Sequence, residues 1–515
     1  MLFESLFNNN ILKSYPNTIL DPNKLYDLNY IDNEIVRLSF TRPVYTIDPE
    51  NCKDADDGFS LWNENNKLYL AIHIADPTSF IPISSDPNSL FQLLKKRSTS
   101  CYPSANDPIH MMPRNILNRS SLMEDSDDSN LKFAISLILE IDKDTLLPVN
   151  VSYDSLKFTV INCKNEFKFS YVSAANTKND VINLCRKIGV AMRQNRNDSI
   201  KLDSKTKIKY VNSIPYFENI NHEVLEVQHM IEEFAIYTNS YVGNYLYYYL
   251  CLKNVAGDNY NAIFRSCRAN DIYENLDQKT ISDDEIFAYL VKEGISAKYT
   301  NKPEFHEMIS KEQLYTHFTS PIRRFSDCIC HYLLKFIYLH RLDKEKKAPF
   351  TATELKEIID CIHSKSKLCK KISLEDNKFR TIQCIFNKIN SFDFVPRGFY
   401  NKFIQLKCEY NGCHFNNGLK YINILITTIY EYSNYSLINT FNVKISSSFI
   451  INEWDDDYYK KNLYPYGLCL PKIFNIDIYD MHLSDRNIFT RSGKIKDNLV
   501  FNNLYLYLKN ISKNM

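Results

Sequence analysis

Four aspartates lie within ten positions of the sequence. The stretch TIDPENCKDADDGFSLW, residues 46–62, contains Asp48, Asp54, Asp56 and Asp57. Carboxylates this close raise one another's pKa unless a cation compensates them. Mg²⁺ selects oxygen ligands of this kind, and bound ions can polarise a phosphate and activate a water molecule. The residues alone leave two interpretations open: a catalytic metal site, and an acidic loop with a structural role.

A second stretch has the side chains to bind a phosphate. YTHFTSPIRRFSDCICHYLL, residues 315–334, places Arg323, Asp327 and His331 four positions apart, which on a helix would put them on one face. The serine and proline of SPIRRF predict a helix over 320–342. The guanidinium of Arg323 near this helix start could bind a phosphate with two parallel hydrogen bonds. The alternative is an ordinary Arg–Asp–His network.

Together the two stretches resemble the signatures of the RNase II (RNB) family of exoribonucleases. TIDPENCKDADDG is similar to the family's aspartate signature, IHIADP follows at the family's interval, and YTHFTSPIRRFSD is almost unaltered from the second signature. The resemblance covers roughly residues 40–390. It implies a hydrolase that degrades single-stranded RNA from the 3′ end with Mg²⁺ and releases nucleoside 5′-monophosphates.

The resemblance implies catalytic roles for five residues. Asp48 and Asp57 match the best direct ligands of a Mg²⁺ ion that also binds the scissile phosphate. Asp54 and Asp56 would hold a second ion or orient the attacking water. Arg323 matches the arginine that contacts the scissile phosphate, where it would stabilise developing charge.

The resemblance also implies four residues that contact RNA. Tyr102, in TSCYPSANDPIHMMP, matches a tyrosine that packs on the 3′-terminal nucleotide, and Tyr171, in FKFSYVSA, matches a second tyrosine of the RNA channel. Stacking of this kind tolerates any base. Glu232, in HMIEEF, matches a glutamate that could accept a hydrogen bond from the ribose 2′-hydroxyl, with Glu233 as the alternative. Glu375, in ISLEDNKF, corresponds to a glutamate near the catalytic chamber.

The chain departs from the family pattern at several points. Gly58 replaces the usual small alanine, a mild change expected to loosen the turn, and Tyr332 stands where arginine is common. Leu202 aligns with the second aromatic residue that usually sandwiches the terminal nucleotide, so the family's tight 3′-end clamp cannot be carried over. Family members usually carry two cold-shock-type barrels before the catalytic domain, and residues 1–36 are too few to encode them. We therefore expect a weaker grip on long RNA and lower processivity.

The patterning along the chain predicts an α+β protein in three parts. Residues 1–36 are expected to form an amino-terminal arm. Residues 37–395 are expected to form the catalytic domain, a mixed sheet with surrounding helices, with strands over 37–82 and mainly helices from 178 onward. Residues 396–515 return to strand patterning and resemble a degenerate OB-like RNA-binding β-barrel.

Composition limits the class of protein. The chain has 515 residues, a net charge of +1 and 44% hydrophobic residues, typical of a globular protein of two or three domains. A polyanion must therefore be held by a local basic surface. The fourteen cysteines contain no CxxC pair, and no apolar run reaches the length of a membrane helix. Without a recognisable secretory signal, we expect a cytoplasmic and monomeric protein with no membrane partner.

A catalytically inactive RNA-binding or scaffold relative is the alternative function. Such a relative would be expected to have lost at least one signature aspartate or Arg323. This chain retains all of them, which favours an active nuclease.

Overall fold

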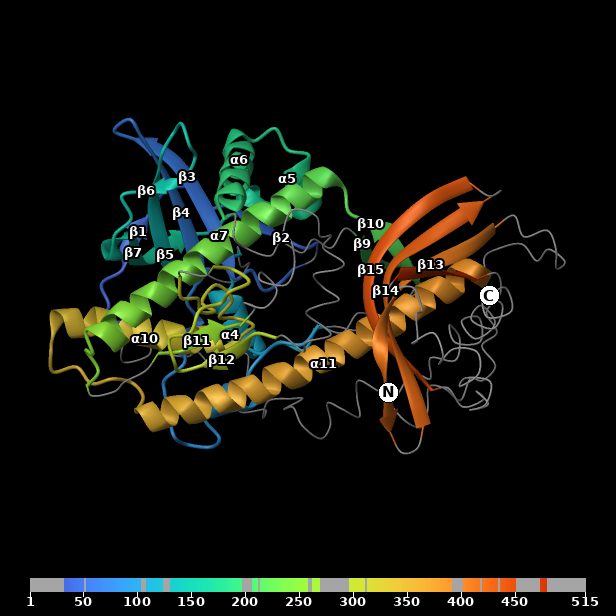
Figure 1. The fold of residues 1–515 in the computed structure, drawn as a ribbon. Helices are drawn as coiled ribbons and strands as arrows, with labels where there is room; N and C mark the ends of the chain where they lie inside the picture. The colour runs from blue at the N-terminus through green and yellow to red at the C-terminus, as the bar shows by residue number, and fades with distance from the viewer. Residues whose placement is uncertain are drawn as a thin grey trace.

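The computed structural model describes most of the chain between residues 32 and 478. The described ranges are 32–50, 52–102, 108–123, 130–196, 206–211, 214–257, 262–268, 296–310, 313–390, 402–416, 419–433, 436–450 and 473–478, with only some side chains after residue 370 of the last helix. Within these ranges the chain has the predicted α+β architecture (Figure 1). The expected arm, 1–36, lies almost wholly outside them, and Leu202 does as well.

A six-stranded mixed sheet forms the centre of the amino-terminal half. The first and second strands of its path are parallel to each other, and the remaining neighbours are antiparallel. The path runs through β1 (Leu38–Phe40), β7 (Leu156–Asn162), β5 (Leu131–Ile141), β4 (Lys67–Ala75) and β3 (Asp57–Glu64), and β6 (Pro148–Val149) pairs with β5. The predicted strand KLYLAIHIA is β4, whose residues from Leu68 onward are almost all buried. The mixed sheet expected from the sequence is therefore confirmed.

Helices surround this sheet, and most of them lie in the region after residue 178 that was expected to be mainly helical. They are α3 (Leu90–Arg97), α4 (Arg114–Ser120), α5 (Tyr171–Ala175), α6 (Asp180–Asn195), α7 (His222–Leu246), α10 (Phe325–Leu342) and α11 (Ala352–Asn390). The helix α7 passes in front of the sheet in Figure 1, and the ring of its Phe234 packs edge-on against Phe59 of β3, with centroids 5.9 Å apart. This packing brings the middle of α7 beside the beginning of β3.

Short two-stranded pairs interrupt the region that was expected to be mainly helical. They are β9 (Thr206–Val211) with β10 (Ile214–Asn219), and β11 (Phe264–Ser266) with β12 (Lys298–Thr300). A further pair, which lies before that region, joins β2 (Thr46–Asp48) to β8 (Lys168–Ser170) in parallel. Three or six residues per strand are too few to produce a clear period in the sequence.

The prediction that a helix begins at Ser320 is wrong, because α10 begins at Phe325. The carboxylate of Asp327 accepts a hydrogen bond from the backbone N–H of Ser320 at 2.8 Å, which folds the chain back into a turn before the helix. Arg324 is the cap residue and has an extended backbone. Arg323 therefore lies on the turn ahead of the helix.

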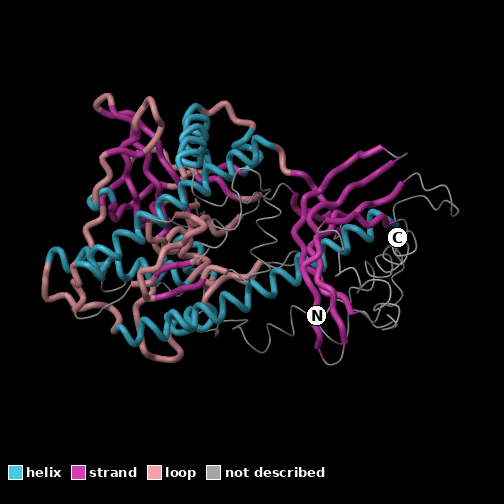
Figure 2. Tube along the Cα trace, viewed as in Figure 1, coloured by secondary structure: helices cyan, strands magenta, loops and turns pink. Residues whose placement is uncertain are grey.

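The carboxyl-terminal part contains a curved antiparallel sheet (Figure 2). Its strands lie in the order β15 (Ser436–Ile450), β14 (Leu419–Ser433), β13 (Lys402–Asn416) and β16 (Ile473–Ile478). The sheet touches β10, since Phe217 packs against Phe441 with ring centroids 5.2 Å apart. The strand patterning expected here is confirmed, whereas the described strands do not by themselves establish a closed OB-like barrel. The expected boundary near 396 falls between Asn390 and Lys402, outside the described residues.

No helix in the described ranges has both the length and the apolar character needed to cross a membrane.

Candidate active site

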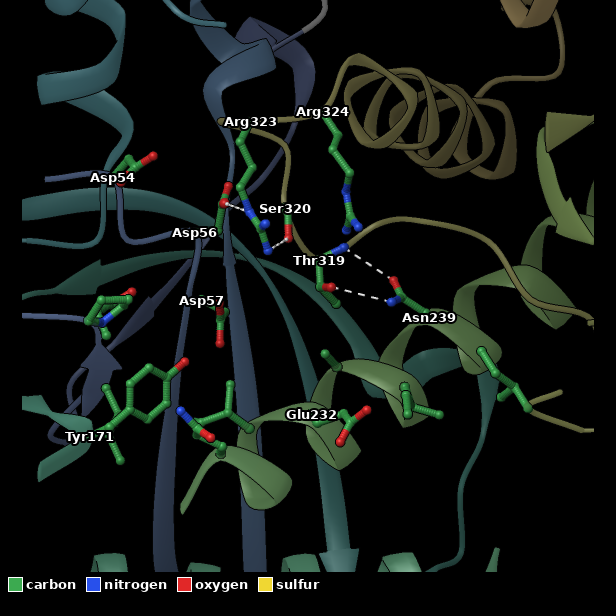
Figure 3. A pocket seen from close by; sticks show the side chains of 18 of the residues that line it. Asp54, Asp56, Asp57, Tyr171, Glu232, Asn239, Thr319, Ser320, Arg323 and Arg324 are labelled. Atoms are coloured by element: carbon green, nitrogen blue, oxygen red, sulfur yellow. Dashed lines mark hydrogen bonds and ion pairs between the residues drawn. The ribbon is translucent and has the colours of Figure 1, made fainter. Parts of the chain in front are cut away.

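A pocket of about 670 Å³ lies where β2, β3, α7 and the turn before α10 meet (Figure 3). We call it the aspartate pocket. It brings together eight of the nine residues singled out from the sequence, namely Asp48, Asp54, Asp56, Asp57, Tyr102, Tyr171, Glu232 and Arg323. The ninth, Glu375, belongs to α11, but its side chain is outside the described part of the structure.

Two strand pairings position the aspartates. Asp48 is the last residue of β2, and its pairing with Ser170 of β8 places the next residue, Tyr171, on the same side of the pocket. Asp57 is the first residue of β3 and lies opposite Ile74 of β4. The two pairings therefore place two carboxylates that are nine positions apart in the sequence at the end of β2 and the beginning of β3.

Gly58 is packed closely, contrary to the expectation of a loosened turn. A Cβ atom at this position would lie 3.0 Å from the backbone oxygen of Tyr45 and 3.1 Å from a methyl group of Val44. Tyr45 and Phe59 also exchange two backbone hydrogen bonds, of 2.8 and 2.9 Å. Glycine thus allows the beginning of β3, next to Asp57, to approach the segment that precedes β2 closely.

Asp56 joins the two sequence motifs. Its carboxylate accepts a hydrogen bond from the backbone N–H of Ile322 at 2.7 Å and one from Nε of Arg323 at 3.1 Å. The side chain is buried, and burial raises its pKa to about 8 although Arg323 and the Ile322 N–H oppose that shift. Arg323 also donates to the hydroxyl of Ser320 at 3.0 Å, which holds its guanidinium over the pocket.

Asp54 is held by hydrogen-bond donors on the other side of the pocket. The hydroxyl of Tyr102 donates to its Oδ2 at 2.8 Å, and Nδ1 of His110 lies 3.4 Å from the same oxygen. Burial acts to raise the pKa of Asp54, but the nearby His110 and the hydrogen bonds from Tyr102 and Cys52 outweigh it, so the pKa is lowered. Tyr102 and Asp54 therefore occupy one wall together.

Asp48 and Asp57 have fewer partners in the described structure: Oδ1 of Asp48 accepts only a long bond of 3.6 Å from the thiol of Cys52. Oδ2 of Asp48 is buried and accepts no hydrogen bond within the described structure. Burial, with the nearby charges of Asp56 and Asp54, raises the pKa of Asp48 to about 6. Burial and the charge of Asp48 raise the pKa of Asp57 to about 7. These two carboxylates repel each other, and a cation between them would relieve the repulsion.

The donor set is suited to a hard divalent cation. Among the described residues, no group of three or more His, Cys, Asp or Glu side chains is close enough to enclose an ion by itself. Mg²⁺ is usually bound through one or two carboxylates together with waters and substrate phosphate oxygens. The unpartnered oxygen of Asp48 and the neighbouring Asp57 fit this mode of binding, while Asp54 and Asp56 already accept hydrogen bonds from protein groups.

The predicted Arg–Asp–His face does not exist. Asp327 binds the neighbouring Arg324 at 2.8 Å instead of extending a stripe from Arg323. His331 is fully buried, with Nδ1 3.3 Å from Asp76 of the IHIADP stretch. Asp76 also binds Lys335 at 3.1 Å, so this part of α10 belongs to a buried ion network under the site. The prediction of one shared helix face from the four-residue spacing is wrong because the helix starts after Arg323.

Asn239 is a positioning residue that the sequence reasoning did not assign. Its Oδ1 accepts hydrogen bonds from the backbone N–H groups of Phe318 and Thr319, at 2.8 and 3.2 Å. Its Nδ2 donates to Tyr315 at 3.0 Å and to Thr319 at 3.3 Å. Figure 3 shows the contacts between Asn239 and Thr319. A buried asparagine in an apolar helix was the available signal, since such a group requires partners. These hydrogen bonds hold in place the segment that leads to Arg323.

The structure distinguishes the two candidate glutamates of α7. Glu232 lines the aspartate pocket with its side chain about half exposed, and lies 3.2 Å from Arg193. Glu233 is only 2% exposed and is held by Arg193 and by Arg196. Glu232 is thus the residue of this pair that faces the pocket (Figure 3), while Glu233 has a packing role.

The RNB domain family model matches residues 37–340. This is more than half of the chain and includes both motifs, so the chain belongs to the RNB domain family. The resemblance inferred from the two sequence motifs is confirmed.

Individual proteins resemble the chain at lower identity. It is 26% identical over 412 residues to the mitochondrial exoribonuclease II of Saccharomyces cerevisiae, a match that covers 70% of this chain and 40% of that protein. The chain therefore spans well under two thirds of this relative's length.

Solved structures share the fold. One is RNase R of Mycoplasma genitalium in complex with ribose-methylated single-stranded RNA, with a TM-score of 0.59, 16% identity, and coverage of 88% of this chain and 76% of that one. Another is the yeast protein Ssd1, described as a pseudonuclease, with a TM-score of 0.55, 16% identity, and coverage of 82% and 54%. The same fold thus occurs in a ribonuclease and in a pseudonuclease.

Proposed function

We propose that this chain is a Mg²⁺-dependent hydrolase that degrades single-stranded RNA from the 3′ end to nucleoside 5′-monophosphates. The observation that carries the proposal is the meeting of four aspartates and Arg323 in one pocket, although 267 positions separate Arg323 from Asp56. Membership of the RNB domain family and similarity to a protein named exoribonuclease II support it.

The residues of the aspartate pocket have complementary tasks in this proposal. Asp48 and Asp57 would hold a divalent ion, which when bound polarises the phosphate and lowers the pKa of water. Arg323, fixed by Asp56 and Ser320, would donate hydrogen bonds to a phosphate oxygen as negative charge develops there. A water molecule activated by this ion would be the attacking group.

The aromatic and acidic side chains around these groups would bind the end of the RNA. Tyr102 is 45% exposed and lines the pocket, and Tyr171 lines it from the start of α5. Each ring can stack on a base without selecting its sequence. Glu232 can accept a hydrogen bond from a ribose 2′-hydroxyl, the group that distinguishes RNA from DNA. A role for Glu375 remains a prediction.

A catalytically inactive RNA-binding relative is the second candidate, because the pseudonuclease Ssd1 has a similar fold. The retained carboxylates favour the enzyme. Asp48 and Asp57 are held close enough for Asp48 to raise the pKa of Asp57, an unfavourable arrangement for a protein that only binds a polyanion.

The proposal also covers the division of the chain into domains. We propose that residues 396–515 form the OB-like RNA-binding domain, after an arm over 1–36 and a catalytic domain over 37–395. The antiparallel sheet of β13 to β16 agrees with a domain of this kind. A monomeric state and a cytoplasmic location also remain predictions.

The proposal is tested by the products of RNA digestion. Single-stranded RNA labelled at its 5′ end is incubated with the full chain and Mg²⁺, and the products are separated by length and identified by mass spectrometry. We expect successive shortening from the 3′ end, nucleoside 5′-monophosphates and no digestion in EDTA. Binding of RNA without digestion under any divalent metal would instead establish the inactive relative.

A further inference from the structure

A second pocket, of about 250 Å³, adjoins the aspartate pocket and shares Tyr102, Arg323 and Arg324 with it. We call it the basic pocket. Its other walls come from β11 and β12, from residues 98–100 and from one face of α11. The proposed nuclease reaction does not use these walls.

The two pockets differ in charge. The basic pocket is lined by six serine or threonine side chains, no carboxylate and four cationic side chains, namely Arg265, Arg323, Arg324 and Lys370. The aspartate pocket is lined by five carboxylates as well as by Arg193, Arg196 and the two shared arginines, so only there are the cations offset by acidic side chains. Hydroxyl groups and guanidinium groups together are the usual donors to a phosphate.

Arg265 differs from the two shared arginines of the basic pocket because it has no acidic partner among the described residues. Arg323 and Arg324 have acidic partners, Asp56 and Asp327 respectively. Arg265 is half-buried, lies over the ring of Tyr299 at 4.5 Å, and forms no ion pair within the described structure. Burial lowers the pKa of Arg265, and the charge of Arg324 contributes to the same shift. An unpaired guanidinium in such a position favours the binding of an anion.

The walls of the basic pocket are held in place by hydrogen bonds. The backbone N–H of Ser100 donates to the backbone carbonyl oxygen of Arg323 at 2.9 Å. The backbone N–H of Phe325 donates to the backbone carbonyl oxygen of Ser98 at 2.9 Å. On the opposite wall, Ser326 donates to the hydroxyl of Tyr299 at 3.0 Å. These bonds hold Tyr299, whose ring lies under Arg265, and the backbone that carries the shared arginines before any ligand arrives, which reduces the entropy lost on binding.

The charge of the reaction product matches this arrangement. Under the proposed function, an internal phosphodiester with one negative charge becomes a phosphate monoester, which carries about 1.5 to 2 negative charges at neutral pH. The added charge is repelled by the carboxylates of the aspartate pocket and attracted by Arg265 and Lys370. A volume of about 250 Å³ is also small for an oligonucleotide but near the lower range of small-ligand sites.

We propose that the basic pocket binds the 5′-phosphate of the released nucleoside monophosphate, with Arg265 and Lys370 as donors, before the product leaves the protein. The inference rests on the proposed function for the source of the ligand. The binding itself can be measured without RNA cleavage, so the two can fail separately.

The test is equilibrium binding of AMP to the full chain in EDTA, measured by isothermal titration calorimetry. Because Arg265→Gln removes one charged hydrogen-bond donor, we expect it to weaken AMP binding about tenfold or more. The matched control is Arg268→Gln, three positions away, where the side chain is 80% exposed; AMP affinity should not change there. Lys370→Gln, at an exposed position of α11, should weaken AMP binding several-fold without affecting folding.

Two further ligands identify the group that is recognised. Adenosine should bind all variants with the same weak affinity, and inorganic phosphate should compete with AMP in the wild type. Equal AMP affinity in the wild type, Arg265→Gln and Lys370→Gln would overturn the proposal. If AMP binding depends on Arg265 while the chain digests no RNA, the anion site stands and the proposed nuclease activity fails.

Discussion

Nε of Arg323 lies 3.1 Å from Oδ2 of Asp56, and this contact joins two motifs that are 267 positions apart in the sequence. The N–H of Ile322 binds the other oxygen of the same carboxylate at 2.7 Å. Asp56 therefore anchors the turn that presents Arg323. The arginine is oriented by its neighbours before any substrate binds, a requirement for efficient stabilisation of a charged transition state.

Arg323→Lys tests this orientation. Lysine keeps the positive charge but lacks the planar fork that can bind Asp56, Ser320 and a phosphate oxygen at once. We expect the rate of digestion of single-stranded RNA to fall by about 10²-fold. The matched control is Arg268→Lys at an exposed position, which should leave the rate unchanged. A rate near that of the wild type for Arg323→Lys would show that charge alone suffices.

Tyr102 allows the ring and the hydroxyl group to be tested separately. Tyr102→Ala removes the stacking surface and should weaken binding of a short RNA by about 1–3 kcal/mol. Tyr102→Phe keeps the ring and loses only the 2.8 Å hydrogen bond to Asp54, so RNA affinity should change little. Both affinities can be measured by fluorescence anisotropy in EDTA. Equal losses in the two variants would mean that the hydroxyl, rather than the ring, holds the RNA.

Asn239→Ala tests the support of the segment before Arg323. The substitution removes the acceptor for the backbone N–H groups of Phe318 and Thr319, which are then left unsatisfied in the interior. We expect the free energy of unfolding to fall by at least ~2 kcal/mol. Asn63→Ala, at the exposed end of β3, should change it by less than about 0.5 kcal/mol. Urea denaturation of both variants provides the comparison.

The dependence of stability on pH follows from the raised pKa values of Asp48 and Asp57. Their pKa values are about 6 and about 7 in the folded protein, against 3.8 for an ordinary aspartate. Between pH 4 and pH 7 these two carboxylates therefore bind more protons in the folded protein than in the unfolded chain, so their contribution to metal-free stability falls as pH rises through this range. Because Mg²⁺ binds the ionised carboxylates, it should raise Tm more at pH 8 than at pH 5.

Scanning calorimetry with and without Mg²⁺ at the two pH values measures this effect. The double variant Asp48→Asn, Asp57→Asn is the control and should lose the difference. An equal Mg²⁺-induced rise of Tm in the double variant would show that the ion binds elsewhere.

Much of the site could be predicted because the relevant residues stand in two continuous motifs. The carboxylates of Asp48 and Asp57 and the guanidinium of Arg323 occur in the order and spacing that the RNB family requires, and all line one pocket. The strand β4 was equally clear, since its run of buried apolar residues is long enough to read directly. Here local sequence and tertiary structure agree.

The turn before α10 could not be predicted by the same means. Ser320 and Pro321 are strong local signals for a helix start, but the carboxylate of Asp327 binds the N–H of Ser320 and moves the start to Phe325. Asn239 and Arg265 were not singled out, because their importance depends on residues distant in the sequence, such as Thr319 and Tyr299. Contacts of this kind arise only after the chain has folded.

The central claim is that Asp57 helps to hold a divalent ion that makes the aspartate pocket a nuclease site. The most direct measurement compares the wild type and Asp57→Asn in the digestion of end-labelled single-stranded RNA with Mg²⁺ at pH 8, together with Tm in EDTA. We predict that the rate falls by at least about 10²-fold while Tm is unchanged or higher, because the substitution removes the repulsion between Asp57 and Asp48. Digestion at the wild-type rate by a fully folded Asp57→Asn protein would contradict the claim.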